Sequence, residues 1–353
     1  MKIVFTGGGT AGHIMPNVAI INSLSPTDEV FYFGCNGMEK TLVPQHTQKV
    51  KFVEIFAPKF KRKFALSNLL IPFRLLKSVA RCKKQLKAIS PDLIFCKGGY
   101  VSLPVALAGK SLSIPVVLHE SDVTTGLANR LCAKNCALFL SAFENTAIKN
   151  ARTVGTPIRG EIYSAKANEG LQTMGFDGKK PILIFLGGSQ GANQLNALAQ
   201  GVYPYLKDLF DIFVVSGRGK SFEQKEGLKS VEFCHNLFDC LKASSLCVTR
   251  GGANTLCELC AINLPFITLP LTASSRGEQT ANALYFSQRG CGVTLQGEVT
   301  VERLIKAVKD LQKKSQLYQH KQRKLNIDGT QLIVDLLYGI ANNQKGKAPK
   351  EKK

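Results

Sequence analysis

The 353-residue sequence contains no run of about 18 apolar residues, the length that a helix needs to cross a bilayer. Its first residues enter a strand-like pattern directly, without the basic, apolar and small-residue regions of a secretory signal. Hydrophobic residues make up 44% of the chain, which is typical of a soluble globular protein, and the length is enough for two ordinary domains. We therefore expect a protein that stays in the cytosol and spans no membrane.

Patterns for metal and common cofactor sites are also missing. The eleven cysteines are scattered and odd in number, which favours reduced thiols over a disulfide framework. Cys257 and Cys260 have the spacing of half a zinc site, but no second pair matches it, so no metal is expected. Neither of the two main glycine turns is a Walker A loop, because no Gly-Lys-Ser/Thr follows it. Neither main glycine turn combines G-x-G-x-x-G spacing with an acidic residue about 20 residues further on, which disfavours a nicotinamide site.

Acidic residues are scarce, with 25 Asp and Glu against 46 Lys and Arg, so the net charge is +21. None lies between Glu54 and Asp92, where Lys and Arg alternate with Phe and Leu over residues 59–87. Such a basic amphipathic segment is typical of a helix lying on an anionic membrane surface. A solvated basic helix whose apolar side is core fits the pattern equally well. The chain has no recognised nucleic-acid motif or aromatic platform, so no nucleic acid is expected as a partner.

Two similar glycine turns open the two halves of the chain. Residues 2–13 read KIVFTGGGTAGH and residues 181–193 read PILIFLGGSQGAN, with the glycine pairs 180 positions apart. Each is an apolar run, a glycine cluster and the start of a helical pattern. Glycine adopts positive φ at little cost and lets backbone N–H groups approach a ligand at the positive end of a helix dipole. The repeat predicts two α/β domains facing a shared cleft, each with a phosphate-cradling turn.

Strand and helix patterns alternate in both halves, which predicts doubly wound parallel sheets. In the first half, strands are expected near 2–6, 30–34, 51–55, 93–96, 115–119 and 137–140, and helices near 15–24, 37–46, 68–88, 102–112, 125–133 and 143–149. In the second, strands are expected near 182–186, 211–215, 231–233, 246–248, 266–268 and 292–295, and helices near 191–206, 236–243, 253–261, 278–288, 300–313 and 318–342.

The domain boundaries follow from composition. We expect an N-terminal domain over 1–157, a polar linker over 158–179 and a C-terminal domain over 180–330. Residues 331–353 would hold a helix that returns to the first domain and a basic tail, and the stretch 341–353 is expected to be disordered because it is poor in apolar residues.

Ligands in open parallel sheets bind outside the carboxyl ends of the strands. Five polar or glycine motifs stand at such ends in this sequence, which is stronger evidence than one glycine cluster alone. They are TGGGTAGH (6–13), KGGYVS (97–102), HESD (119–122), GGSQGA (187–192) and RGGANTLCE (250–258).

These motifs, with VGTPIR (154–159) and EQTANA (278–283), resemble in their order the MurG family of bacterial peptidoglycan synthesis. The similarity runs from about residue 2 to about residue 330. The resemblance implies a GT-B fold of two Rossmann-like domains. It also implies inverting transfer of N-acetylglucosamine from UDP-N-acetylglucosamine to the C4 hydroxyl of the muramoyl-pentapeptide of lipid I, giving lipid II. GT-B enzymes stabilise the diphosphate leaving group largely with backbone N–H groups, so the resemblance implies neither an obligatory metal nor another cofactor.

On the donor side the resemblance implies a nucleotide-sugar site in the C-terminal domain. Ser189 would lie beside the diphosphate, the backbone near Cys234 would dock the uracil, Glu258 would accept from the ribose, and Gln279 would bond the transferred sugar. Arg159 is a further candidate for the donor. The remaining donor-side candidates line the start of one helix: Ala253, Asn254, Thr255, Leu256 and Cys257.

On the acceptor side, Thr10, Ala11, Gly12 and His13 would form a loop that contacts phosphate and sugar. His13 is the candidate general base, because its pKa range suits proton uptake near neutral pH, although it could instead cap the helix or orient the loop. Asp122 stands where asparagine is frequent in the family. It could accept from a sugar hydroxyl or serve as the alternative base.

Two further acceptor-side features have open alternatives. Gly99 and Tyr100 resemble the family's acceptor-side turn, but Tyr100 could equally be a packed aromatic at a strand end. His119 closes a strand, so we expect a buried imidazole whose hydrogen bonds are satisfied.

The lipid-linked acceptor strengthens the case for membrane contact, since the inner leaflet that holds it is anionic. We expect the protein at the cytoplasmic face of the cell membrane, with apolar side chains in the interface and cations at the headgroups. The residues expected in this contact are Phe64, Leu69, Leu70, Phe73, Leu76, Lys77 and Arg81.

Two other classes of function remain open from the sequence. One is another GT-B enzyme that uses a UDP-sugar, such as a glycolipid glycosyltransferase or a non-hydrolysing nucleotide-sugar epimerase, and the motifs at 98–102 and 119–122 argue against it. The other is a non-catalytic protein that binds a nucleotide sugar as a signal, which the donor residues alone do not exclude.

Overall fold

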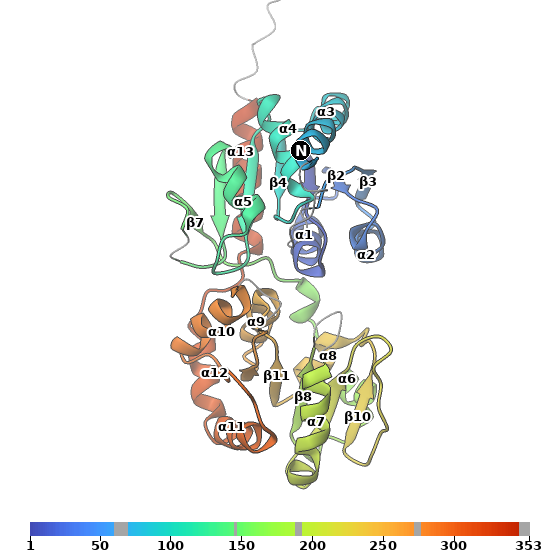
Figure 1. Cartoon of the computed structure of the whole chain (residues 1–353), viewed down its shortest axis with the longest axis vertical. Helices are drawn as coiled ribbons and strands as arrows, with labels where there is room; N and C mark the ends of the chain where they lie inside the picture. Colours follow the sequence, from blue (N-terminus) through green and yellow to red (C-terminus); the bar gives the residue numbers. More distant parts are fainter. Residues whose placement is uncertain (60–69, 145–146, 188–192, 272–276, 346–353) are drawn as a thin grey trace, which may run out of the picture. The chain divides into compact units, whose positions relative to one another are not determined.

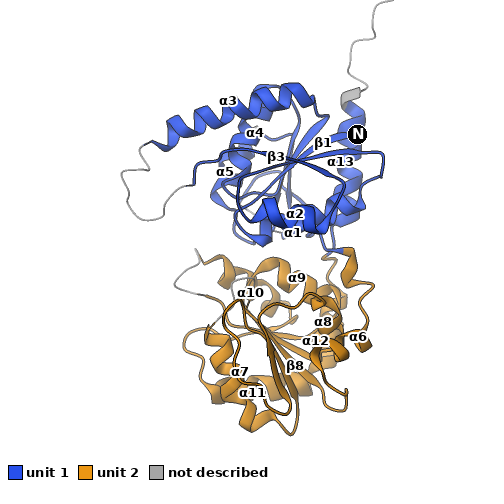
Figure 2. Ribbon diagram, turned by 90° about the vertical axis from the view of Figure 1, so that its right-hand side faces the viewer, with its two compact units in different colours: residues 1–159, 328–353 blue, residues 160–327 orange. Residues whose placement is uncertain are grey.

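The computed structural model describes residues 1–59, 70–144, 147–187, 193–271 and 277–345. The chain forms two compact units, Met1–Arg159 with Asp328–Lys353 (unit 1) and Gly160–Ile327 (unit 2), which Figure 2 distinguishes by colour. Each is an α/β layer structure (Figure 1).

Unit 1 is built on a parallel sheet of seven strands among its described residues, in the order β3-β2-β1-β4-β5-β6-β7. The central strands β4 and β5 are buried along their whole length, as is typical of a parallel sheet that is covered on both faces. The strands are β1 (Lys2–Thr6), β2 (Glu29–Gly34), β3 (Val50–Glu54), β4 (Leu93–Cys96), β5 (Val116–Glu120), β6 (Leu138–Ser141) and β7 (Arg152–Thr153).

Alternate side chains of each strand enter two separate cores, because successive residues of a strand point to opposite faces. In β1, Ile3 and Phe5 pack against α1 (Ala11–Ser23), α2 (Met38–His46) and α13 (Thr330–Lys345). Val4 joins the opposite core, which α3 (Ile71–Ile89), α4 (Ser102–Ser111) and α5 (Leu127–Cys132) cover.

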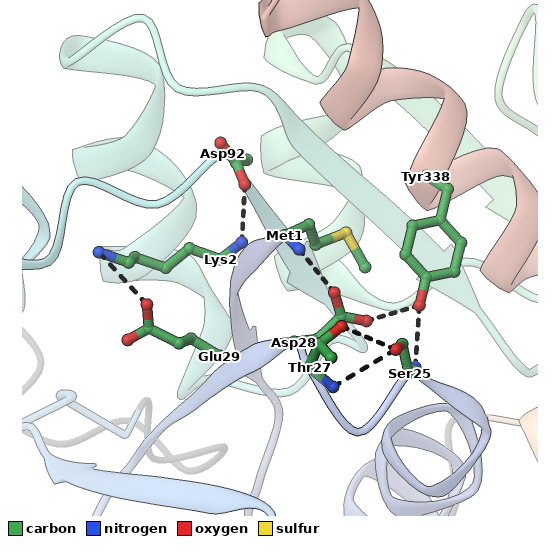
Figure 3. Close-up of polar contacts among 8 residues, drawn as sticks. All are labelled: Met1, Lys2, Ser25, Thr27, Asp28, Glu29, Asp92 and Tyr338. Carbon is green, nitrogen blue, oxygen red and sulfur yellow. Dashed lines mark hydrogen bonds and ion pairs between the residues drawn. The ribbon is translucent and has the colours of Figure 1, made fainter.

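Helix α13 brings the end of the chain back to unit 1, where Ile333, Val334 and Leu337 are buried against the sheet. Figure 3 shows its Tyr338 hydroxyl beside the loop before β2. The hydroxyl donates to Asp28 Oδ2 over 2.5 Å and accepts from the backbone N–H of Ser25 over 2.9 Å. Asp28 Oδ1 accepts from the Met1 amino group, so one carboxylate joins α13 to the start of β1.

Unit 2 repeats the design with six strands among its described residues, all parallel, in the order β10-β9-β8-β11-β12-β13. Helices α7 (Asn193–Leu206) and α11 (Val301–Lys313) cover one face of the sheet through Leu195, Val202, Leu304 and Val308. The strands are β8 (Ile182–Leu186), β9 (Asp211–Val215), β10 (Leu228–Val231), β11 (Leu246–Thr249), β12 (Phe266–Thr268) and β13 (Val293–Thr294). The helices are α6 (Ala167–Met174), α7 (Asn193–Leu206), α8 (Leu237–Ala243), α9 (Ala253–Ala261), α10 (Glu278–Gln288), α11 (Val301–Lys313) and α12 (Ser315–Arg323).

The segment 158–179 differs from the linker expected there. From Gly160 onwards it belongs to unit 2, where a short 3-10 turn (Gly160–Ile162) is followed by helix α6. Helix α6 lies directly against α8, because Gly170 has no side chain to hold the two backbones apart. The polar composition that suggested a linker reflects the exposed face of this helix.

The single helix expected over 318–342 is also wrong. Helix α12 ends at Arg323 and α13 starts at Thr330. Between them, Asp328 Oδ1 accepts from the backbone N–H of Thr330, and Gly329 lies against the Val154 carbonyl, where a Cβ would be only 2.1 Å from the oxygen. The second helix continues to Lys345 instead of ending near 342, and residues 346–353 of the expected tail lie outside the described residues.

Three smaller differences concern short elements. The described part of 143–149 contains no helix, strand β10 ends at Val231 instead of spanning 231–233, and the two-residue strand β7 was not predicted. The two residues of β7, Arg152 and Thr153, are both exposed and give no hydrophobic alternation by which a strand could be recognised.

The contact between α6 and α8 leads to a stability prediction. A Cβ on Gly170 would lie 2.1 Å from the Asp239 carbonyl oxygen, so Gly170→Ala should force the helices apart and lower the free energy of unfolding by about 1–3 kcal/mol. Gly339→Ala is the matched control in α13, where no atom lies within 4 Å of the added Cβ. Its helix propensity should raise stability by about 0.5–1 kcal/mol. Urea unfolding of both variants measures the effects, and wild-type stability of Gly170→Ala would contradict the packing described.

Candidate functional site

Three of the motif loops meet at the carboxyl edge of the unit 1 sheet, because β1, β4 and β5 pair side by side in parallel. The turn after β4 packs onto the turn after β1. A Cβ on Gly99 would lie 2.6 Å from the Gly8 carbonyl oxygen and 3.3 Å from Nδ1 of His13. Gly9 in turn lies against the ring of Tyr100, where a Cβ on this glycine would be 2.9 Å from Cε1. The fold thus brings Gly99, Tyr100 and His13 together.

His13 lies in the first turn of α1, where its Nδ1 is 3.1 Å from the Thr10 hydroxyl. Burial and the nearby Lys97 ammonium lower the pKa of His13 below 6.5. The carboxylates of Glu120 and Glu39 oppose this shift, as does a hydrogen bond to the Gly8 carbonyl, but they do not cancel it. The imidazole is therefore neutral at pH 7, the form that a general base requires. Of the loop residues, Thr10 is exposed, whereas Ala11 and Gly12 are half-buried.

Lys97, the first residue of the 97–102 motif, is one of the largest fully buried side chains and lies beneath these loops, a role that the sequence did not reveal. Its side chain is 1% exposed, and its ammonium donates to Nδ1 of His119 over 2.8 Å and to the Ser121 hydroxyl. Because Nδ1 accepts this bond, Nε2 carries the proton of the neutral ring and donates to the Gly155 carbonyl over 2.9 Å. The expectation of a buried, satisfied His119 is confirmed.

The loop that carries Asp122 is organised by its neighbour Glu120. The Glu120 carboxylate accepts from the backbone N–H groups of Asp122 and Gly126 over 3.1 and 2.8 Å, and from the Asn129 amide over 3.0 Å. Asp122 itself is partly exposed beside this buried carboxylate. Arg159, also half-buried, ends unit 1 just after the segment 154–158, which is held to α13 by two bonds between Ile158 and Thr330.

In unit 2, the turn after β11 packs against α10. A Cβ on Gly251 would lie 2.1 Å from the Gln279 carbonyl oxygen, and the buried Asn282 donates to the Gly251 carbonyl over 3.1 Å. The Gln279 side chain accepts from the backbone N–H of Leu271 over 3.1 Å. The structure therefore joins the predicted 250–258 and 278–283 motifs.

Helix α9 begins in this turn with no acidic residue in its first turn and no side-chain cap. Ala253 is buried, whereas Asn254, Thr255 and Glu258 are partly exposed. The side chains of Leu256 and Cys257 are fully buried in the unit, so any contact of these two with a ligand would come from the main chain. Ser189 lies outside the described residues.

Arg250 and Cys234 complete the polar groups at this edge. The guanidinium of Arg250 donates to the Gln194 side chain and to the Leu269 carbonyl, each over 2.9 Å, and burial lowers its pKa. It thus ties the ends of β11 and β12 to the start of α7, a role that its place in the RGGA run did not reveal. Cys234 is 8% exposed, with its sulfur 3.6 Å from that of Cys240. In the described part of the chain, no three His, Cys, Asp or Glu side chains are grouped to hold a metal ion.

Helix α3 exposes two kinds of residue on one surface. Leu70, immediately before the helix, Phe73 and Leu76 are 51%, 72% and 67% exposed, beside the exposed cations Lys77 and Arg81. The opposite side of the helix packs through Ser78, Cys82 and Leu86. The apolar residues of α3 therefore lie partly in the core and partly on the surface. Phe64 and Leu69, also expected in the membrane contact, lie outside the described residues. No helix in the described chain has the length and apolar character that crossing a bilayer requires.

The hydrogen bonds of His119 predict a pH-dependent stability. Burial and Lys97 hold the pKa of His119 well below 6.5, so from about pH 6.5 downwards the unfolded chain takes up a proton that the folded protein does not. Acidification should therefore lower the free energy of unfolding, by up to about 1.4 kcal/mol per pH unit for this ring. His119→Gln should remove this contribution and flatten the pH slope.

Urea unfolding at pH 7.5, 6.5 and 5.5 measures this slope. His320→Gln, at an exposed position of α12, is the control and should keep the wild-type slope. An unchanged slope in His119→Gln would contradict the neutral, buried ring described above.

Comparison with known proteins agrees with this architecture. Residues 3–139 match the glycosyltransferase family 28 N-terminal domain, and residues 182–337 match the glycosyltransferase family 28 C-terminal domain. The crystal structure of Acinetobacter baumannii MurG is similar in fold, with a TM-score of 0.74 at 22% identity over 96% of this chain and 99% of that one. This likeness and the two parallel-sheet units confirm the predicted GT-B fold.

Two curated relatives are similar in sequence over nearly their whole length. A UDP-N-acetylglucosamine–N-acetylmuramyl-(pentapeptide) pyrophosphoryl-undecaprenol N-acetylglucosamine transferase of Bacillus cereus is 35% identical over 96% of this chain and 99% of its own. The transferase of the same description from Lachnoclostridium phytofermentans is 38% identical over 87% and 89%. The chain therefore belongs to glycosyltransferase family 28 and, within it, to these N-acetylglucosamine transferases, the MurG family.

Proposed function

We propose that this protein transfers N-acetylglucosamine from UDP-N-acetylglucosamine to the C4 hydroxyl of the N-acetylmuramyl-pentapeptide of lipid I, forming lipid II for peptidoglycan synthesis. The observation that carries the proposal is the 35% identity with a named transferase over 96% of this chain and 99% of the relative. A match of this extent includes both halves of the chain, so it favours this function over a glycolipid enzyme that shares only the donor half.

The acceptor loops of unit 1 support a role for His13 as the general base. Its neutral imidazole would take the proton of the acceptor hydroxyl as the oxygen attacks C1 of the donor sugar. As the new C1–O bond forms, the C1–O bond to UDP breaks on the opposite side, so the configuration at C1 inverts and UDP leaves. Thr10, Ala11 and Gly12 with Gly99 and Tyr100 would hold the acceptor sugar and phosphate. Asp122, beside Glu120, would accept a hydroxyl bond or serve as the alternative base.

The edge of unit 2 would hold the leaving group. The first turn of α9 contains no acidic residue, and its backbone N–H groups, at Ala253, Asn254 and Thr255, would stabilise the negative charge that develops on the diphosphate. In this proposal Ser189 contributes a further phosphate contact, and the main chain of Leu256 and Cys257 continues the same surface. Glu258 would bind the ribose, and the backbone near Cys234 would dock the uracil. Gln279 would bond the transferred sugar, and Arg159 is a further candidate for contact with the donor.

The exposed side of α3 would hold the enzyme at the cytoplasmic face of the membrane. Phe73 and Leu76 expose apolar surface that water does not favour, and Lys77 and Arg81 lie beside them to meet anionic headgroups. Leu70 continues this surface, and in the proposal Phe64 and Leu69 extend it. The net charge of +21 adds a general attraction to an anionic leaflet.

A turnover assay tests the reaction. Purified protein with UDP-N-acetylglucosamine and a lipid I analogue should release UDP and form the disaccharide product, whereas either substrate alone should release almost none. His13→Gln should lower kcat by about 10²–10⁴-fold because the proton acceptor is lost, with the donor KM little changed. Asp122→Asn is the matched comparison for the alternative base.

Three results would contradict parts of this proposal. Donor binding without any UDP release would favour a nucleotide-sugar sensor. Transfer to a different lipid-linked sugar in preference to the lipid I analogue would favour another glycolipid enzyme. A kcat of His13→Gln equal to that of the wild type, with a large loss in Asp122→Asn, would move the base to Asp122.

Co-sedimentation with anionic phospholipid vesicles tests the membrane contact. Lys77→Gln with Arg81→Gln should lower vesicle affinity by about tenfold or more, since each cation near an anionic surface is worth about 1 kcal/mol. Phe73→Ser with Leu76→Ser should lower it further. Lys306→Gln with Lys309→Gln removes two exposed charges from α11 and is the control. Equal binding by all of these variants would exclude the α3 surface as the contact.

A further inference from the structure

Glu39 is a carboxylate fully buried within unit 1, in the first turn of α2, with 0% of its surface exposed. Burying a carboxylate is costly unless hydrogen bonds replace its water. No ion pair to Glu39 is present among the residues that the structure describes. Its burial must therefore be balanced by hydrogen bonds from neutral groups.

Two backbone N–H groups from different loops supply those bonds. Glu39 Oε2 accepts from Gly9, in the turn after β1, over 3.2 Å. Glu39 Oε1 accepts from Cys35, in the turn after β2, over 3.0 Å. One side chain thus joins the two turns at the carboxyl edge of neighbouring strands.

Neighbouring glycines leave the space that this carboxylate fills. A Cβ on Gly8 would lie 2.6 Å from Oε1, and a Cβ on Gly34 would lie 2.8 Å from Cγ of Glu39. The first glycine turn is therefore shaped around an internal carboxylate. Its Gly9 N–H is already bonded to an anion of the protein, which differs from the open phosphate cradle that the sequence suggested for this turn.

The turn held by Glu39 is the one that contacts His13 and the acceptor loops. Gly8 accepts a hydrogen bond from the His13 ring and lies against Gly99, and Gly9 lies against Tyr100. We propose that Glu39 is a positioning residue of the transfer reaction, which fixes the turn at residues 7–9 so that His13 is held in place beside Gly99 and Tyr100. This inference rests on the proposed function of His13.

The charge of Glu39 also acts on His13, which gives the inference an electrostatic signature. The groups that face the ring are Lys97 from the turn after β4, Glu120 from β5 and Glu39 from α2. Glu39 raises the pKa of His13 against the lowering by burial and Lys97, and it raises the pKa of Cys35 and Tyr100 as well. Removing its charge should therefore lower the pKa of His13 further.

The test compares Glu39→Gln with Glu29→Gln. Glu29 is a half-exposed carboxylate on β2, near Lys2 and Lys51, and is the matched control. Glu39→Gln should lower kcat by about 10–100-fold through misplacement of His13, with the donor KM within about twofold of the wild type. In histidine-labelled protein without substrates, NMR should show the His13 titration displaced to lower pH. Glu29→Gln should change neither property.

A measurement on the unaltered protein keeps the inference testable if Glu39→Gln does not fold. The Gly9 amide of the wild type should exchange with solvent at least about tenfold more slowly than the exposed Thr10 amide, because it is bonded to Glu39. Equal exchange of the two amides, or wild-type kcat and His13 titration in Glu39→Gln, would overturn the inference. If the His13 titration shifts in Glu39→Gln but the wild-type protein transfers no sugar, the proposed function is refuted, whereas the action of Glu39 on His13 is upheld.

Discussion

Both candidate sites depend on close contact between two backbone segments of the same unit, which only a glycine allows. In unit 1 the turn after β4 lies on the turn after β1 at Gly99, and in unit 2 the turn after β11 lies on α10 at Gly251. A side chain at either glycine would push the loops apart. Because the neighbouring strands end at the same edge of each sheet, this close packing gathers residues that are far apart in the sequence into one surface.

The carboxyl edges of the two sheets carry similar glycine turns but differ in their buried charges. Beneath the unit 1 loops, Lys97, Glu39 and Glu120 are all buried, and each is bonded to groups that shape a loop. Their opposing effects, together with burial, leave the pKa of His13 below its ordinary value. In unit 2 the buried charge at the corresponding edge is the Arg250 guanidinium, and the first turn of α9 has no acidic residue. The first edge therefore suits proton transfer, and the second suits an anionic ligand.

The basic character of the chain has a structural counterpart in α3. Its inner side is a short stripe in which Ser78, Cys82 and Leu86 are buried, with Val79 and Ile89 packed partly against the same core. Its outer side can then expose Phe73 and Leu76 together with Lys77 and Arg81. Exposed large apolar residues ringed by cations are unusual on a surface that meets only water, which is why the proposed contact is with an anionic membrane.

The sequence by itself determined the two-unit parallel α/β architecture, most strand positions and the motif loops, because buried parallel strands and glycine turns have strong local signatures. It did not determine that residues 160–179 pack as part of unit 2. It also did not determine that one helix ends at Arg323 and another begins at Thr330. Both features depend on a glycine that fits against a carbonyl oxygen far away in the sequence. Only the tertiary structure placed Glu39, Lys97 and Arg250 beneath the loops. Each is an ordinary polar residue in the sequence, and its role depends on at least one distant partner. Gly9, whose N–H donates to Glu39, is 30 positions away, His119 is 22 positions from Lys97, and Gln194 is 56 positions from Arg250. Local pattern cannot encode which distant group will share a buried site, because that is decided when the strands pair.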